Sequence, residues 1–250
     1  NWHLQPQTLE SVCQKIQNKT KLLILNSPNN PSGTVHGNLK ALAIVAKKYD
    51  VIIIADEIYA ELDFTGEYKS IAHFYPEGTI ISSGLSKWCG AGGWRLGTFI
   101  FPNELDEIKQ TLHSLASETF TAVSAPIQYA AIKAYTENFN SYLKDSRRIL
   151  NCIAKYIHNE LTKTGLHCQK PQGGFYMLCD FTDAILLSNE ISNSTSLCKK
   201  ILNDIGFAML PGADFGIDEK HLITRIAFVD FDGNKALNLA KNQVHLSDDF

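Results

Sequence analysis

The feature that most constrains the fold of this chain is a set of short apolar runs separated by segments of helical pattern. The run Val51–Ala55 is continuously apolar and mostly β-branched. Such a strand is buried on both faces, which is typical of parallel sheets. Apolar residues at helical spacing predict helices at Thr8–Asn18 and Asn38–Lys48, so we predict an α/β fold with a mostly parallel sheet and flanking helices. Three further runs are expected to be strands: Lys21–Leu25, Thr79–Ser83 and Gly97–Phe101.

The pattern changes in the second half of the chain. Helical spacing extends from Pro126 to about Lys163, with a polar interruption near Asn138–Asn140. A second, smaller α/β unit follows this helical stretch. Its two strands are expected at Gly174–Cys179 and Ile223–Phe228.

The length of the chain allows one large domain or two modest ones, since it has 250 residues. Hydrophobic residues make up 44% and charged residues 20%, a balance typical of globular proteins rather than disordered ones. We place the domain boundary inside the long helical stretch. Residues 1–145 then form a large domain and residues 146–250 a smaller C-terminal α/β domain.

Composition also excludes several kinds of partner. The net charge is −3 without a basic block, so we expect neither a nucleic acid nor an anionic membrane as partner. The six cysteines form no C-x-x-C pair and the eight histidines show no H-x-x-x-H spacing, so we expect no metal site. Free thiols and the absence of an 18-residue apolar run favour a cytoplasmic protein.

Polar side chains follow the predicted strands at the points where they end. Asn30 follows the first strand, Asp56 and Tyr59 follow the second, and Lys87 follows the third. Ligands of open parallel sheets bind beyond the carboxyl ends of the strands. Ser86 and Arg95 lie in the same glycine-rich connection as Lys87. The sequence therefore predicts a polar site at this edge of the sheet.

Four ordered motifs give these residues a family resemblance. They are Asn-Asn-Pro-Ser-Gly at 29–33, Asp-Glu-Ile-Tyr at 56–59, Leu-Ser-Lys at 85–87 and Gly-Gly-Trp-Arg-Leu-Gly at 92–97. Together they resemble the fingerprint of class I/II aminotransferases, the fold-type I enzymes that depend on pyridoxal 5′-phosphate. The similarity spans nearly the whole chain, because it continues at Pro171–Tyr176, Leu210–Gly212 with Phe215-Gly216, and Arg225–Phe228.

The resemblance implies a catalytic role for three residues. Lys87 is expected to form a Schiff base with the cofactor and to move a proton between the substrate Cα and the cofactor C4′. Asp56 is expected to face the pyridine nitrogen and keep it protonated, since a nearby carboxylate favours the charged form. Tyr59 and Asn30 are expected to donate hydrogen bonds to the phenolic oxygen of the cofactor.

The resemblance also implies how the anionic groups are bound. Arg95 is expected to bind the cofactor phosphate, and Arg225, together with Asn30, the substrate α-carboxylate, because a guanidinium offers forked donors. One position departs from the family pattern: many relatives have Ser where this chain has Gly84. Ser86 is expected to supply the hydroxyl instead, with Ser83 as the alternative. Trp94 is expected to be a core residue that holds the turn.

Each of these residues also has an ordinary structural interpretation. Lys87 alone would be read as a solvated surface lysine, and Asp56 as a helix cap or turn residue. Asn30 could shape a turn before Pro31, and Tyr59 could pack in the core. Arg225 could pair with a nearby aspartate of the segment 230–232. The ordered motifs favour the functional interpretation in every case.

The resemblance implies a homodimeric transaminase that moves an amino group between an aspartate-like or other common amino acid and a 2-oxo acid. A C–S lyase or a related lyase of the same fold is the first alternative, because it would use the same residues. Family members are much longer, so we expect the N-terminal portion of the cofactor-binding domain to be missing, in either a proteolytic fragment or a truncated product. The second alternative is therefore an inactive fragment or a non-catalytic interaction domain.

Overall fold

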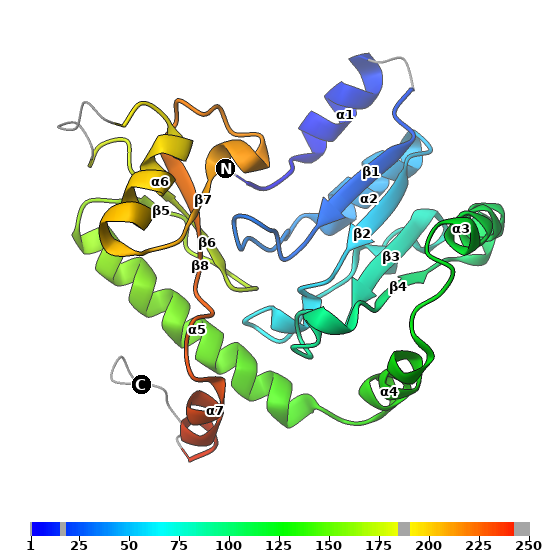
Figure 1. Ribbon diagram of the computed structural model, residues 1–250. Coiled ribbons are helices and arrows are strands. Elements are labelled where there is room, and N and C mark those ends of the chain that lie inside the picture. Colours follow the sequence, from blue (N-terminus) through cyan, green and yellow to red (C-terminus); the bar gives the residue numbers. More distant parts are fainter. Residues whose placement is uncertain (1, 16–18, 185–190, 243–250) are drawn as a thin grey trace. The chain divides into compact units, whose positions relative to one another are not determined.

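The structure is a computed structural model that describes residues 2–15, 19–184 and 191–242 (Figure 1). Its contacts separate the chain into two compact units. The first unit contains the residues up to Pro28, Val35–Leu62 and Gly66–Leu143. The second unit contains Asn29–Thr34, Asp63–Thr65 and the residues from Lys144 on. The predicted boundary divides the chain with one cut near residue 145, whereas two short earlier segments pack with the second unit.

The first unit is built on a four-stranded sheet with the order β1-β2-β3-β4. Strands β1, β2 and β3 are parallel, and β4 runs antiparallel to β3, which confirms the predicted α/β fold with a mostly parallel sheet. The connection from β3 to β4 contains a 3-10 turn and no α-helix, whereas parallel strands are usually joined by a crossover helix. The strands are β1 (Leu22–Asn26), β2 (Ile52–Asp56), β3 (Thr79–Gly84) and β4 (Gly97–Ile100).

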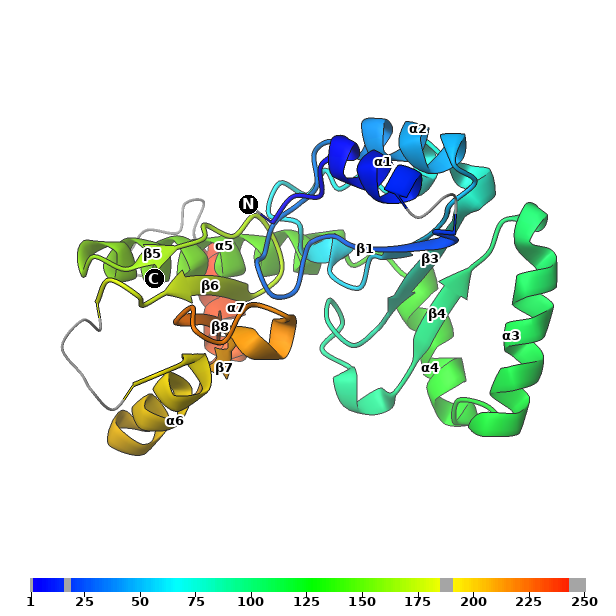
Figure 2. The same ribbon diagram turned by 90° about the horizontal axis from the view of Figure 1, so that it is seen from above.

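Helices α1 (Pro6–Lys15) and α2 (Leu39–Lys48) pack together on one side of this sheet (Figure 2). Their apolar faces bury Cys13 and Leu42 against Ile53 of β2, all of which are fully buried. Helix α1 starts earlier than predicted because proline is tolerated in the first turn of a helix. Residues 16–18 of the predicted helix lie outside the described part of the chain.

The long predicted helix is two helices. Helix α4 (Ala125–Thr136) ends where the backbone of Glu137 becomes extended, and α5 (Asn140–Lys163) begins after the polar interruption seen in the sequence. Helix α3 (Asp106–Thr119) was not predicted, and none of its residues is buried.

The two outer strands of the first sheet carry exposed apolar side chains. Ile24 of β1 is 66% exposed, and Phe99 and Ile100 of β4 are 57% and 59% exposed. Single exposed apolar residues are common on protein surfaces, but apolar residues grouped on a sheet edge favour pairing with another chain segment.

The second unit holds an antiparallel sheet with the order β5-β6-β8-β7. The two predicted strands are present as β6 (Tyr176–Asp180) and β8 (Ile223–Ala227). Asn193 caps the following helix by accepting a hydrogen bond from the Ser196 N–H at 2.8 Å. The remaining elements are β5 (His167–Cys168), α6 (Ser194–Ile205), β7 (Leu210–Pro211) and α7 (Gly233–Asn242).

A buried histidine gives the first unit a predictable pH dependence. His36 is 5% exposed, and burial, aided by the neighbouring His3, lowers its pKa to about 4. The folded state therefore favours neutral His36, while the unfolded chain takes up a proton below its ordinary pKa of about 6.5. Stability is lost as the pH falls from about 6.5 towards 4. Between pH 7 and 5 the loss should be about 2 kcal/mol.

Urea unfolding of the chain and of His36→Gln at pH 7 and pH 5 checks this expectation. The variant lacks the titrating ring, so its stability should fall by about 2 kcal/mol less than that of the unchanged chain over this interval. Equal losses in the two proteins would contradict the assignment of the effect to His36.

Candidate active site

The carboxyl ends of the three parallel strands form one edge of the first sheet. Asn26, Asp56 and Ser82 are neighbours in register at the ends of β1, β2 and β3. The Asn26 side-chain amide donates a hydrogen bond to the Asp56 carbonyl oxygen at 3.1 Å, which ties the first two strand ends together. This hydrogen bond therefore fixes the backbone at Asp56, the last residue of β2.

Three predicted catalytic residues lie together beyond this edge. The Lys87 Nζ lies 5.6 Å from the ring centre of Tyr59, which is 4% exposed. The positive charge of Lys87 also acts on the Asp56 carboxylate. An amine is thus gathered with a carboxylate and a phenol, although Lys87 is about 30 residues from Asp56 and Tyr59 in the sequence.

The environment of Asp56 determines its protonation. Burial raises the pKa of Asp56 above its ordinary value, while the Ile58 N–H and the charge of Lys87 act in the opposite direction. The Ile58 N–H donates to Asp56 Oδ1 at 3.4 Å. A further cation at the carboxylate would lower its pKa, because an opposite charge nearby favours the ionised form. The site is therefore suited to a protonated ring nitrogen.

The loop that carries Lys87 is held by its own backbone. Leu85 is fully buried, and its N–H donates to the Leu96 carbonyl at 3.4 Å. The Leu85 carbonyl accepts from the Ala91 N–H at 3.2 Å, and the Lys87 carbonyl accepts from the Gly90 N–H at 3.2 Å. These bonds close a tight loop between β3 and β4, so the lysine is presented from an anchored turn.

The structure explains the glycine at position 84. A Cβ atom at Gly84 would lie 2.7 Å from the Leu96 carbonyl oxygen and 3.2 Å from the Gly97 Cα. Because β3 and β4 approach so closely here, a serine would require the backbone to move. The phosphate-binding hydroxyl expected at Ser86, which is half-buried, stays a prediction.

Arg95 has an unusual backbone conformation. Its φ of 56° and ψ of 45° place it in the left-handed region, which non-glycine residues rarely adopt and which often marks functional positions. Its guanidinium is exposed and donates to the Gly92 carbonyl at 2.8 Å. Trp94 is 46% exposed, so the prediction that it is a core residue is wrong. The turn is held instead by the bond from Arg95 and by the Trp94 N–H, which donates to the Ala91 carbonyl at 3.0 Å. Phosphate binding by Ser86 and Arg95 stays a prediction.

The second unit brings Arg225 and Asn30 together. Arg225 on β8 donates from Nη1 to Asn30 Oδ1 at 2.9 Å. Its Cζ lies 4.2 Å from the ring centre of Tyr176 and 4.9 Å from that of Phe215. The Arg225 Nε is buried and has no hydrogen-bond partner in the described part of the chain. An oriented guanidinium with an unused donor is suited to a carboxylate.

Tyr176 ends the sequence motif at 171–176, for which the resemblance implies no catalytic or binding role. The structure shows that its ring supports Arg225, and strand pairing explains how the two meet. Residue 178 of β6 lies opposite Arg225 of β8, so Tyr176 is two residues away on the neighbouring strand. The sequence could not have identified this role, because it depends on the register between β6 and β8.

The segment that contains Asn30 is fixed by a dense set of hydrogen bonds. Asn29 Oδ1 accepts from the Ser32 hydroxyl at 2.7 Å, and the Gly33 N–H donates to the Asn29 carbonyl at 2.7 Å. The Gly33 carbonyl accepts from the N–H groups of Gln172 and Gly173 at 2.7 and 3.1 Å. Segment 29–34 is therefore docked on the second unit, which positions Asn30 for Arg225.

Only glycine fits at position 33. Its φ is +69°, and a Cβ atom there would lie 2.7 Å from the Tyr176 carbonyl oxygen and 2.8 Å from the Pro171 Cβ. Gly33→Ala should therefore destabilise the chain by about 2–4 kcal/mol, through left-handed strain and overpacking. Urea unfolding measures this loss, and Gly37→Ala is the matched control, because a Cβ at Gly37 meets nothing within 4 Å. Equal stability of the two variants would contradict this docking.

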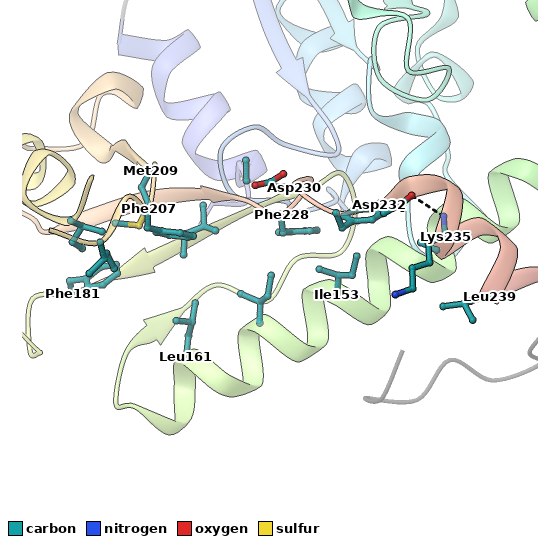
Figure 3. A pocket seen from close by; sticks show the side chains of 17 residues that line it. Ile153, Leu161, Phe181, Phe207, Met209, Phe228, Asp230, Asp232, Lys235 and Leu239 are labelled. Atoms are coloured by element: carbon teal, nitrogen blue, oxygen red, sulfur yellow. Dashed lines mark hydrogen bonds between the residues drawn. The ribbon is translucent and has the colours of Figure 1, made fainter. Parts of the chain in front are cut away.

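A large cavity lies elsewhere in the second unit. It has a volume of about 770 Å³ and is lined by apolar residues of α5, α6, β8 and α7. Figure 3 shows Ile153 and Leu161 of α5 facing the cavity, with Asp232 and Lys235 at one end. The Lys235 N–H donates to Asp232 Oδ1 at 3.0 Å, which is a helix cap. None of the predicted catalytic residues lines this cavity, so we do not assign the chemistry to it.

Residues 2–15, 19–184 and 191–242 contain neither a metal-binding cluster nor a membrane-spanning helix. No group of three or more His, Cys, Asp or Glu side chains there could hold a metal ion. None of the helices in these ranges combines the length and the apolar character that crossing a membrane requires.

Comparison with known proteins identifies the family. The family model for aminotransferase class I and II matches residues 1–237, and the chain belongs to this family. An aspartate/prephenate aminotransferase of Thermus thermophilus is 31% identical over 210 residues, which are 82% of this chain and 52% of that protein. An aspartate aminotransferase of Geobacillus stearothermophilus is 31% identical over 245 residues, 95% of this chain and 60% of the relative. The chain thus spans between half and two thirds of the length of these two relatives.

Solved structures agree with this assignment. The Thermus thermophilus aspartate aminotransferase with maleate superposes with a TM-score of 0.80 at 27% identity, over 96% of this chain and 59% of that chain. An aromatic aminotransferase from Pyrococcus horikoshii gives a TM-score of 0.79 at 28% identity, with 96% of this chain and 62% of that chain covered. The fold is therefore that of the fold-type I pyridoxal-phosphate enzymes.

Proposed function

We propose that this chain carries the cofactor lysine and the substrate arginine of a pyridoxal-phosphate-dependent aminotransferase. The reaction would move an amino group between an amino acid and a 2-oxo acid. The observation that supports this proposal most directly is the grouping of Lys87, Asp56 and Tyr59 at the carboxyl edge of a parallel sheet. Family membership supports it independently.

The side chains of the first unit fit the cofactor. Pyridoxal phosphate, when bound, supplies an electron sink that withdraws charge from the substrate Cα. Asp56 would hold the ring nitrogen in its protonated form, since pairing offsets the burial that raises its own pKa. Tyr59 would donate its hydroxyl hydrogen to the phenolic oxygen. Ser86 and Arg95 would bind the phosphate, Arg95 with its forked donors.

Lys87 would have two tasks. Its amine would hold the cofactor covalently at rest, and it would move the proton at the substrate Cα once the substrate has taken its place. The second task requires an unprotonated amine close to the reacting atoms. The anchored loop between β3 and β4 supports this role, because it limits the positions that the lysine can reach.

In the second unit, Arg225 would bind the α-carboxylate of the substrate. Its planar group is held by the Tyr176 and Phe215 rings and by Asn30, and its buried Nε is unused. Aspartate is the first donor to test, since the relatives from Thermus thermophilus and Geobacillus stearothermophilus are named for it. We further propose a homodimer as the assembly, and a cytoplasmic location stays a prediction.

A product assay tests this function. The natural polypeptide that contains these residues is incubated with pyridoxal phosphate, aspartate and 2-oxoglutarate. Formation of glutamate is expected. Pyruvate and ammonia released from a β-substituted amino acid, without glutamate, would indicate the lyase alternative instead. Neither set of products, with no attachment of the cofactor to Lys87, would favour a non-catalytic interaction domain.

A further inference from the structure

Two cysteines that are distant in the sequence lie side by side in the second sheet. Strand β5 runs antiparallel to β6, and Cys168 lies directly opposite Cys179. Both are free thiols in the structure. This pair is not visible in the sequence, because ten residues separate the two positions and a turn must first bring the strands together.

The hydrogen-bond pattern shows which kind of pair they form. The Gln169 N–H donates to the Leu178 carbonyl at 2.8 Å, so residues 169 and 178 form a hydrogen-bonded pair. Bonded and non-bonded pairs alternate along an antiparallel ladder, which makes Cys168 and Cys179 a non-bonded pair. In such pairs the Cα atoms are about 4.5 Å apart. A disulfide needs Cα atoms about 4.4–6.8 Å apart, so these strands can be bridged without a large movement.

The two thiols differ in access and acidity. Cys168 is half-buried, whereas Cys179 is fully buried. A hydrogen bond between the two thiols lowers the pKa of Cys168 and raises that of Cys179. Thiolates, not thiols, attack disulfides, so Cys168 is the group that a small oxidant meets and modifies first.

We propose that Cys168 and Cys179 are a redox-active pair that forms a reversible disulfide between β5 and β6. A low-molecular-weight disulfide such as oxidised glutathione is the oxidant. The Cys168 thiolate attacks one glutathione sulfur, forms a mixed disulfide and releases the other glutathione as a thiolate. Cys179 then attacks the Cys168 sulfur and passes its proton to the departing glutathione thiolate, which leaves as the second glutathione. The protein loses two electrons and two protons, and oxidised glutathione is reduced to two glutathione molecules.

Strand β6 would link the Cys168–Cys179 disulfide to Arg225, the candidate substrate-binding residue. Strand β6 pairs with β5 on one side and with β8 on the other, and Arg225 lies opposite Leu178. Oxidation would therefore covalently fix the strand that also carries the Tyr176 ring under Arg225. The disulfide itself does not require the proposed function, and its test does not use activity.

Peptide mapping of the full 250-residue chain tests the pair. The chain is equilibrated with mixtures of reduced and oxidised glutathione, alkylated and digested with chymotrypsin, which cleaves after Phe175 or Tyr176, between the two cysteines. With rising oxidised glutathione, we expect two of the six cysteines to become resistant to alkylation. The peptides with Cys168 and Cys179 should be recovered linked, and dithiothreitol should separate them.

Three variants distinguish this pair from general thiol oxidation. In Cys179→Ser, oxidation should stop at the mixed disulfide of Cys168 with one glutathione. In Cys168→Ser, Cys179 should stay unmodified because it is buried. Cys152→Ser, which changes a half-buried cysteine on α5, should still form the link. If both thiols of the unchanged chain stay fully alkylatable at every glutathione ratio, or if Cys168 links to another cysteine, the proposal is overturned. Mapping of the unchanged chain decides even if a variant fails to fold.

Discussion

Replacing Lys87 with alanine should abolish covalent attachment of pyridoxal phosphate to this protein and reduce amino transfer by at least about 10²–10⁴-fold. The lower bound comes from the proton transfer alone, because a positioned general acid or base contributes about that factor. The loss should appear in kcat, since the lysine acts on the reacting atoms. Borohydride reduction followed by peptide mapping measures attachment, and glutamate formation measures activity.

Lys40→Ala is the control for this variant. Lys40 is an exposed lysine at the start of α2, so its loss removes the same charge without touching the candidate site. Surface lysines react with pyridoxal phosphate at high concentration, so the comparison is made at the lowest concentration that labels the unchanged protein. If pyridoxal phosphate labels Lys87→Ala to the same extent as Lys40→Ala, Lys87 is not the cofactor lysine.

Arg225→Gln should be the second most damaging change. The proposed α-carboxylate contact has two charge-assisted hydrogen bonds, each worth about 1.5–3 kcal/mol. Their loss corresponds to about 10²–10⁴-fold in kcat/KM. Most of the loss should appear in KM, because the carboxylate is bound equally in the ground state and the transition state. Covalent labelling of Lys87 should be unchanged, which separates this effect from loss of the cofactor.

Arg225→Lys gives the matched comparison. Lysine keeps the positive charge but lacks the planar fork that lies 4.2 Å from the Tyr176 ring centre and donates to Asn30. We expect an intermediate loss of about 10–10²-fold, in line with one lost charge-assisted hydrogen bond. If Lys and Gln at this position give equal losses, charge contributes nothing. If neither variant changes KM, Arg225 does not bind the substrate.

The sheet of the first unit was predictable because local patterns determine it. Val51–Ala55 is an unbroken apolar run, so a strand formed by it has apolar side chains on both faces and is buried on both. The predicted helix ends shifted by one or two residues, as at Pro6, because terminal turns depend on capping rather than on apolar spacing. The antiparallel direction of β4 could not be predicted, because a strand's own residues do not encode its direction.

The candidate site was predictable only as a set of residue types. The motifs identified Lys87 and Asp56, but their closeness depends on how β2 and β3 pair. The exposure of Trp94 could not be predicted from the sequence, because it depends on which segments pack against the turn. The Cys168–Cys179 pair was missed for a related reason. Contacts across a ladder depend on strand register, and register is a tertiary property.

The hydrogen bond between Asn30 and Arg225 joins positions that are 195 residues apart. At a synthesis rate of about 5–20 residues per second, Asn30 is added to the chain about 10–40 s before Arg225. During that interval segment 29–34 also lacks Gln172 and Gly173, on which it docks. A nascent chain therefore forms the Asn30–Arg225 contact only after β8 has been synthesised, and any polypeptide that ends before β8 keeps Lys87 but cannot form that contact.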